Sequence, residues 1–500
     1  MSFAARSSLR SGWRKLLRGI VIAHRWLGIG TCLLFVLWFV SGIVMLYVRM
    51  PELSDAERAA HAPPIDWRAV RLTPAQALTS IVPATQRAPL DLTLQQWLGE
   101  PVYRFTQGGI AFAVSASDGH RITAIDPAIA AASAREFAQV DRVHWRETLL
   151  RDQWTVIGRY NPHRPLQRIA LADAAHTELY ISGATGEVVQ VTTRRERGWN
   201  WIGAVTHWFY LTELRMYPRA WELVVLWLSG TGIAVAISGL WLGIVRLRRR
   251  RGASRPPLAL FAVTPYRGWM AWHHLAGIVG GVFLLTWIFS GWLSMDPLPL
   301  QDEAALTDLL RAKLAYADSG GAAFPLDDAA RAAWSGSDVR IARFVWEGGR
   351  PVALLSDAAG RALPFDPHSG ARIVWRDAEL FAAMRELFPA AQLVQQIRLE
   401  QPDRYWYPHR GENPLPVLRG VFDDAAHSWV HIDPATGELL QFSNDGLRLH
   451  RWLFEALHTL DFPWLLAAGP LRLVAIWLLS LLGLVVAVSG VVIGWRRLLR

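Results

Sequence analysis

Long uncharged stretches alternate with long polar ones along the chain. Four of these stretches contain no charged side chain over 21 to 23 consecutive residues. About 20 apolar residues let a helix cross the ~30 Å hydrocarbon layer of a membrane, because each residue adds roughly 1.5 Å to its length. The pattern therefore predicts four transmembrane helices. The stretches lie between Arg25 and Arg49, Glu222 and Arg246, His274 and Asp296, and Arg472 and Arg496.

The first stretch lies where a signal peptide would lie. It is longer than the ~7–15-residue apolar region of such peptides. In addition, Val48-Arg49-Met50-Pro51 offers no cleavage site made of small residues. We expect this stretch to be retained as a helix.

Basic residues gather on one side of the four stretches. They precede the first stretch, fill the short loop between the second and third, and follow the fourth, and no acidic residue accompanies them. Lysine and arginine beside transmembrane helices are typical of the cytoplasmic side, so both termini and the short loop are expected there. The residues are Arg6, Arg10, Arg14, Lys15, Arg18, Arg25, Arg246, Arg248, Arg249, Arg250, Arg251, Arg255, Arg267, Arg496, Arg497 and Arg500.

The charge and the cysteine content exclude several classes of function. Without the 16 basic residues of these segments, 36 of the 52 basic residues remain against 42 acidic ones, so the formal net charge of +10 reflects membrane topology and not a nucleic-acid surface. The single cysteine, Cys32, excludes an intramolecular disulfide, a thiolate metal cage and covalently attached haem. A redox cofactor would have to be held by other side chains.

The expected fold class is a membrane α-helical protein with four transmembrane helices in two parallel-oriented repeats and two α+β domains outside the cytoplasm. Each external segment is long enough for a domain with its own core. The expected segments are a cytoplasmic tail (1–20), the first helix (21–48), the first external domain (49–221), the second helix (222–246), a cytoplasmic loop (247–268), the third helix (269–295), the second external domain (296–471), the fourth helix (472–495) and a cytoplasmic tail (496–500).

Local patterns predict hairpins in the external segments. Alternating apolar and polar residues occupy 102–125, 177–192 and 429–442, and Ala-Thr-Gly-Glu sequences at Ala184 and Ala435 supply the glycine that a tight turn needs. Residues 73–81 read as a short capped helix.

The two halves of the chain repeat the same motifs. Asp173-Ala-Ala-His176 recurs 251 positions later as Asp424-Ala-Ala-His427. The same offset relates the members of several further pairs, and a related offset of 249 holds near the start of each half. Because each half reads helix, external domain, helix, the halves share one orientation, and a pseudo-twofold axis along the membrane normal is expected to bring equivalent residues face to face. The pairs are His207 and His458, Ser238-Gly239 and Ser489-Gly490, His24 and His273, and Ser41-Gly42 and Ser290-Gly291.

These motifs resemble the PepSY-associated transmembrane family, which includes bacterial inner-membrane ferric-siderophore reductases. The likeness rests on "HRWLG" at 24–28, a Ser-Gly seventeen residues later, a histidine at the end of the external domain and a late Ser-Gly in a basic-flanked helix. The frequent His-Thr-Gly reads His458-Thr-Leu and His207-Trp-Phe here. In the second half "HRWLG" becomes His273-His-Leu-Ala-Gly, which leaves His273 and His274 open as the equivalent of His24.

The histidines are candidate haem ligands. Two opposed neutral imidazoles make a six-coordinate b-type haem iron suited to electron transfer. The repeat supplies two such pairs, His24 with His273 and His207 with His458, near opposite membrane faces, and together with the resemblance it implies two b haems whose iron these four residues bind. His274 and His450 are reserve candidates. A histidine at a helix end is otherwise an interfacial anchor.

The Ser-Gly pairs fit the same arrangement. Seventeen residues of helix span ~25 Å, so Ser41-Gly42 and Ser290-Gly291 are expected near the external face, and Ser238-Gly239 and Ser489-Gly490 near the cytoplasmic one. Small residues at these depths provide room for a flat macrocycle, or equally for close helix packing.

A second candidate site lies in the external segments. Pro162-His163-Arg164 and Pro408-His409-Arg410 stand near Tyr160 and Trp406. Arginine binds carboxylates well, so these residues are candidates for binding an anionic or aromatic chelate. Turn chemistry accounts for the same residues without a ligand.

The resemblance implies two PepSY-like periplasmic domains and the reduction of a periplasmic ferric siderophore or other ferric chelate, which releases Fe(II) because oxygen ligands hold it less firmly than Fe(III). Electrons would enter at the His24/His273 haem and leave at the His207/His458 haem. No nucleotide-binding segment is evident, because Gly230-Thr-Gly232 lies inside a predicted helix, so a flavoprotein or quinol must supply the electrons. The alternatives are a non-redox PepSY-type binding or regulatory protein and a transporter component.

Overall fold

The computed structural model describes residues 3–79, 91–107, 109–247, 264–298, 310, 324–408 and 413–500. The chain forms two compact units. The helical unit comprises 1–49, 198–300 and 449–500, and the sheet unit comprises 50–197 and 301–448. Most of the expected cytoplasmic loop, residues 248–263, lies outside the described residues.

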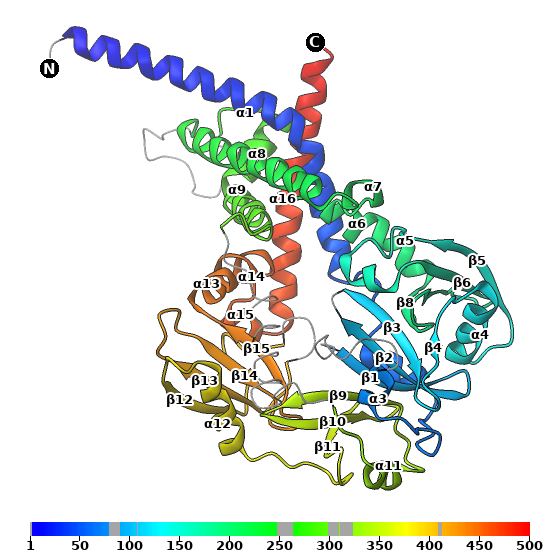
Figure 1. The fold of residues 1–500 in the computed structure, drawn as a ribbon. Helices are drawn as coiled ribbons and strands as arrows, with labels where there is room; N and C mark the ends of the chain where they lie inside the picture. Colours follow the sequence, from blue (N-terminus) through cyan, green and yellow to red (C-terminus); the bar gives the residue numbers. More distant parts are fainter. Residues whose placement is uncertain are drawn as a thin grey trace. The chain divides into compact units, whose positions relative to one another are not determined.

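Four long helices dominate the helical unit: α1 (Phe3–Met45), α8 (Pro218–Val245), α9 (Trp269–Leu293) and α16 (Pro470–Leu498) (Figure 1). Each is long and apolar enough to cross a membrane, the apolar part of α1 being Gly12–Met45. The prediction of four transmembrane helices is confirmed. Helix α1 begins earlier than expected, because no proline interrupts the basic segment and the expected tail 1–20 continues the helix from Phe3.

The four helices form a bundle in which α8 and α16 each pack against both α1 and α9. Phe35 and Phe39 from α1 fill the middle together with Leu284 and Ile288 from α9. Small residues admit the aromatic rings: a Cβ at Gly483 would lie 2.1 Å from Cζ of Phe39. Close packing at glycine is how helices associate where water supplies no hydrophobic drive.

Short helices precede α8 and α16 in each half. The first set is α5 (Arg194–Ile202), α6 (Ala204–Trp208) and α7 (Thr212–Arg215), and the second is α13 (Asp445–Leu453), α14 (Glu455–His458) and α15 (Pro463–Ala467). Helices α6 and α14 each carry one of the candidate histidines, His207 and His458.

The sheet unit contains three antiparallel sheets among its described residues. In the first half, α2 (Asp55–His61) and α3 (Pro74–Thr79) precede β1 (Asp91–Trp97), β2 (Glu100–Gln107), β3 (Ile110–Ser115) and β4 (Arg121–Ile122). Helix α4 (Pro127–Ala138), β5 (Val143–Leu149), η1 (Gly158–His163), β6 (Leu166–Leu171), β7 (Glu178–Ser182) and β8 (Val188–Thr192) follow.

The described part of the second half places a helix and three strands before its next helix, where the first half has four strands before α4. It runs through α11 (Asp328–Trp334), β9 (Ile341–Glu347), β10 (Arg350–Ser356), β11 (Ala362–Phe365), α12 (Asp377–Leu387), β12 (Leu393–Leu399), β13 (Val417–Phe422), β14 (Trp429–Ile432) and β15 (Leu439–Ser443). The predicted hairpins and the helix after Thr73 are confirmed. The Thr73 hydroxyl accepts a hydrogen bond from the backbone N–H of Gln76, and the backbone N–H of Thr73 donates to the Gln76 side chain.

A seven-stranded sheet of order β11-β10-β9-β1-β2-β3-β4 joins the two halves (Figure 1). Strands β1 and β9 pair antiparallel, with Thr93 opposite Arg343. The expected domains, 49–221 and 296–471, therefore share one sheet. Pairing β1 with β9 satisfies backbone groups that an isolated meander would leave at an edge. The ends of both expected domains, 198–221 and 449–471, belong to the helical unit.

The two Ala-Thr-Gly-Glu turns attach the four-stranded sheets, β5-β6-β7-β8 and β12-β13-β14-β15, to the rest of the sheet unit. Gly186 and Gly437 have φ of 71° and 82°. A Cβ would lie 2.3 Å from the Trp97 ring at the first and 2.6 Å from the Trp375 ring at the second, so both positions require glycine. The following glutamates form ion pairs, Glu187 with Arg104 and Glu438 with Arg343.

Candidate site at the paired histidines

Two histidines from the membrane-spanning helices α1 and α9 lie close together in the helical unit. His24 belongs to α1 and His273 to α9, and the centres of their imidazole rings are 6.4 Å apart with an angle of 49° between the ring planes. Residue 24 follows the basic segment and residue 273 follows Arg267, so both lie at the end of the bundle that the basic residues border.

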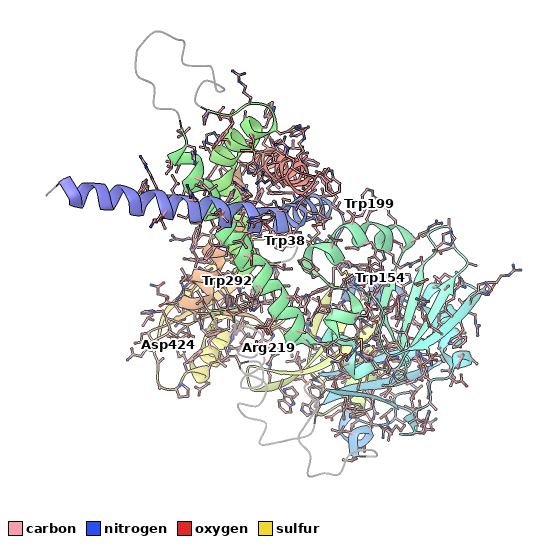
Figure 2. All side chains as sticks on the ribbon, turned by 90° about the horizontal axis from the view of Figure 1, so that it is seen from above. Trp38, Trp154, Trp199, Arg219, Trp292 and Asp424 are labelled. Carbon is pink, nitrogen blue, oxygen red and sulfur yellow. The ribbon has the colours of Figure 1, made fainter. Side chains whose placement is uncertain are left out.

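The second pair lies on the short helices α6 and α14. The ring centres of His207 and His458 are 6.2 Å apart, with an angle of 71° between the planes. Phe454 stacks on His458 at 5.3 Å, and the indole Nε1 of Trp38 on α1, labelled in Figure 2, donates to the backbone carbonyl of His207 at 3.2 Å. Desolvation and the neighbouring His458 lower the pKa of His207 to about 3, which keeps the ring neutral.

The Ser-Gly pairs contact the histidines directly. Nδ1 of His24 lies 3.1 Å from the Ser238 hydroxyl oxygen, and Nδ1 of His207 lies 2.9 Å from that of Ser41. The second half repeats both contacts, with 3.1 Å from His273 to Ser489 and 3.0 Å from His458 to Ser290. In every case the serine and the histidine belong to the same half of the chain.

Each glycine of these pairs lies against the imidazole carbon Cε1. A Cβ would lie 2.7 Å from Cε1 of His24 at Gly239, and 3.5 to 3.6 Å from the corresponding carbons at Gly42, Gly291 and Gly490. The sequence suggested two interpretations of the Ser-Gly pairs, room for a macrocycle and close helix packing. The geometry shows a third role, because the room they provide is filled by the histidine rings.

The structure separates His273 from the reserve candidates. Both ring nitrogens of the buried His274 have partners: Nδ1 lies 2.9 Å from the Thr264 hydroxyl and Nε2 lies 3.0 Å from the carbonyl of Gly243. A nitrogen with a protein partner is not available to a metal. The ring of His450, buried on α13, lies 5.2 Å from that of Phe454 with an angle of 36° between the planes.

Each pair could supply two imidazole ligands to one metal centre. With a bond of about 2.0–2.1 Å from each nitrogen to the metal, the ring centres of two such imidazoles are up to roughly 6.4 Å apart, and the observed separations of 6.4 and 6.2 Å are compatible with this limit. A b-type haem takes two imidazoles of this kind from a protein. The described ranges contain no group of three or more His, Cys, Asp or Glu side chains that could hold a metal.

The sequence of the chain matches the family model described as PepSY-associated TM region over residues 21–378, more than two thirds of its length. The chain belongs to this family. The match includes three of the four paired histidines, His24, His207 and His273, while His458 follows it. No curated protein and no solved structure gives a match.

In this PepSY-associated chain, the described candidates for the external site make contacts within the fold. The Tyr160 side chain is 2 % exposed, and its hydroxyl accepts a hydrogen bond from Arg159. Trp406, equally buried, stacks on His431 at 4.7 Å and donates to the carbonyl of Pro414. Both side chains are therefore buried in contacts within the protein and are not exposed to a ligand.

The remaining candidates of that external site are also engaged in local contacts. Arg164 donates to the Thr155 carbonyl and to the Asn161 side chain, and Nδ1 of His163 lies 3.2 Å from the Ser182 hydroxyl. These contacts favour the turn interpretation. His409 and Arg410 lie outside the described residues.

Sequence reasoning missed an ion pair with a buried carboxylate beside His458. Asp461, 1 % exposed, pairs with Arg472 of α16, and Arg472 also donates to the carbonyl of Thr459 at 3.0 Å. Arg451, itself buried, donates to the backbone carbonyl of Asp461. The repeat between the two halves could not reveal this cluster, because the equivalent positions in the first half hold other residues. Tyr210 stands 251 positions before Asp461, and Asn200 stands 251 positions before Arg451.

Proposed function

We propose that the chain is a haem b protein of the bacterial inner membrane, an oxidoreductase that moves electrons across the membrane to reduce a periplasmic ferric chelate. The observation that carries the proposal is the pair of neighbouring imidazoles at each end of the bundle, with centres 6.4 and 6.2 Å apart. His24 with His273 and His207 with His458 would hold one haem each. When bound, the haem iron supplies reversible one-electron chemistry.

The positions of the two sites suit transfer across a membrane. On α1, seventeen residues separate His24 from Ser41, the serine that contacts His207, so the sites lie ~25 Å apart along the helix. Helix α9 repeats the same spacing from His273 to Ser290. A distance of this size brings one site near each face of a membrane whose hydrocarbon layer is ~30 Å thick.

The repeat arrangement is part of the proposal. Strands β6, β7 and β8 begin 251 positions before β13, β14 and β15, and β1 begins 250 positions before β9. One of the residue pairs between β1 and β9 is Thr93 with Arg343, which are themselves 250 positions apart. This supports two parallel-oriented halves around a pseudo-twofold axis, with the termini and the basic loop in the cytoplasm and PepSY-like segments in the periplasm.

The identity of the substrate rests on the family. Reduction of Fe(III) to Fe(II) weakens its binding by hard oxygen ligands, so a ferric siderophore or similar chelate would release its iron. A flavoprotein or quinol would deliver the electrons, and no nucleic acid takes part.

The test is an oxidised-minus-dithionite-reduced visible spectrum of the purified chain, with haem quantified per chain, repeated for His24→Ala and His458→Ala. We expect sharp low-spin b-type bands, two haems per chain, and the loss of one haem in each variant. Addition of a ferric hydroxamate to the reduced protein should reoxidise it and produce Fe(II) that a ferrous-specific dye captures. Colourless protein, or full haem in both variants, would overturn the proposal and favour a binding or transport role.

A further inference from the structure

The four serines that contact the histidines have their own protons already engaged. The hydroxyl of Ser41 donates to the carbonyl of Trp38 at 3.1 Å, and that of Ser238 donates to the carbonyl of Val235 at 3.0 Å. Ser290 and Ser489 do the same in the second half, at 3.0 Å to Trp287 and 2.9 Å to Val486. In each case the acceptor lies three residues earlier in the same helix. A serine hydroxyl has only one proton to donate.

This arrangement determines which imidazole nitrogen carries the proton. A serine that donates its proton to its own helix leaves its oxygen to accept a hydrogen bond from the histidine, and Nδ1 is then the protonated nitrogen. Backbone carbonyls, which only accept, reinforce this at two sites: Val235 O lies 3.2 Å from Nδ1 of His24, and Val486 O lies 3.1 Å from Nδ1 of His273. The lone pair is then on Nε2.

We propose that Ser41, Ser238, Ser290 and Ser489 are positioning residues that fix the Nδ1-protonated tautomer of the paired histidines and present Nε2 to the iron. This inference rests on the proposed haem function and adds to it. A hydrogen bond from Nδ1 to an oxygen acceptor also makes the imidazole a stronger electron donor, which favours the ferric state and lowers the reduction potential of the iron. The serines therefore set both the orientation and the potential of each site.

The surroundings leave each serine little freedom. Ser41, Ser290 and Ser489 are fully buried, so their oxygens have no access to solvent as an alternative partner. The adjacent glycine holds the ring from a second side, since a Cβ at Gly239 would overlap Cε1 of His24. Serine and glycine thus contact the same imidazole from two sides. In each case they belong to a different helix from the one that carries the histidine.

The experiment compares Ser41→Ala, Ser238→Ala, Ser290→Ala and Ser489→Ala with two matched controls in the full-length chain. Ser229 on α8 and Ser480 on α16 are also buried serines, 251 positions apart, and Ser229→Ala and Ser480→Ala remove the same atom without touching a paired histidine. Haem content, the low-spin signals in electron paramagnetic resonance and the potential of each haem are measured for all six variants.

We expect each positioning variant to raise the potential of its own haem and leave the other unchanged. A threefold change in the ratio of reduced to oxidised haem at fixed solution potential corresponds to about 28 mV, at 59 mV per tenfold for one electron. The Ser238→Thr variant retains a hydroxyl at this half-buried position. We expect its haem to have the same potential as in the parent protein. The controls should keep the parent spectrum and potentials.

Two results overturn the inference. If the parent binds two haems and the four variants keep its potentials and resonance signals, the serines position nothing, while the haem proposal stands. If the control variants shift the potentials as much as the four variants do, the effect is general packing. A parent chain without haem contradicts the proposed function itself, which is a separate outcome.

Discussion

The imidazole rings of His207 and His458 lie with their centres 6.2 Å apart, although 251 residues separate them along the chain. If both rings bind one iron, removing either removes the same site. We expect His207→Ala and His458→Ala each to lose one haem of two, and the double variant to lose no more than either single one, because the two side chains act as a unit. Haem quantified per chain checks this. Additive loss to zero haem in the double variant would show that the two residues serve different sites.

Neighbouring histidines on α9 give a sharper discrimination. His273 faces His24, while both nitrogens of His274 are bonded within the protein. We expect His273→Ala to lose one haem and His274→Ala to keep both while lowering the melting temperature, because the hydroxyl of Thr264 and the carbonyl of Gly243 lose their buried partner. Haem content and thermal unfolding separate the two effects. Haem loss in His274→Ala at unchanged stability would reverse the assignment.

Gly239 lies so close to the His24 ring that a side chain at this position would overlap the ring. The Cβ of Gly239→Ala would lie 2.7 Å from Cε1 of His24, so the ring has to move. We expect this variant to lose the haem of the His24 site or to show an altered low-spin resonance signal. Gly230→Ala on the same helix is the control, because no atom lies within 4 Å of its added Cβ. Equal spectra in both variants would contradict the steric argument.

The ion pair of Asp461 and Arg472 supports the segment that carries His458. Arg472→Met leaves the 1 % exposed carboxylate of Asp461 without this partner. Breaking an ion pair whose two members are both buried costs roughly 3–5 kcal/mol, and the 30 % exposure of the Arg472 side chain makes the cost smaller here. We expect a lower melting temperature for Arg472→Met and partial recovery in the Arg472→Met, Asp461→Asn double variant, as measured by thermal unfolding in detergent. No recovery would show that the charge of Asp461 is satisfied by other groups.

His431 should make the stability of the protein sensitive to acid. Burial and the neighbouring positive charge of Arg419 lower the pKa of His431 to about 3, and its Nε2 accepts a hydrogen bond from Arg419 at 2.7 Å. The unfolded chain, with a histidine pKa of about 6.5, takes up a proton first as the pH falls. The stabilisation from the neutral buried ring is therefore complete above pH ~6.5 and is lost progressively between there and pH ~3.

A tyrosine at this position would remove that dependence. Tyr180 stands 251 positions earlier and donates to Asp152 at 2.6 Å, so the first half already carries such an arrangement. We expect His431→Tyr to flatten the fall in melting temperature between pH 6.5 and 3. His427→Tyr, at an exposed residue whose side chain is 66 % accessible, is the control and should not do so. An unchanged pH profile in His431→Tyr would refute the role of this ring.

Local patterns in the sequence were enough to predict the transmembrane helices, the hairpins and the short helix after Thr73. These elements depend on the length of apolar runs, on alternation and on turn residues, which act between near neighbours. The constant offset also identified the histidine pairs, because a duplicated chain brings equivalent residues toward one axis.

Tertiary structure alone decided the remaining features. The pairing of β1 with β9 joins strands about 250 residues apart, and nothing local distinguishes it from pairing within each half. The choice of His273 over His274 depends on Thr264 and Gly243, which lie on neighbouring parts of the bundle.

The same holds for the serines that hold the histidines and for the burial of Tyr160 and Trp406. A side chain's partner is determined by which helix or strand packs against its own, and that choice comes from the packing of the whole chain. The sequence therefore determined the elements and the candidate pairs, while only the packing decided which atoms face one another.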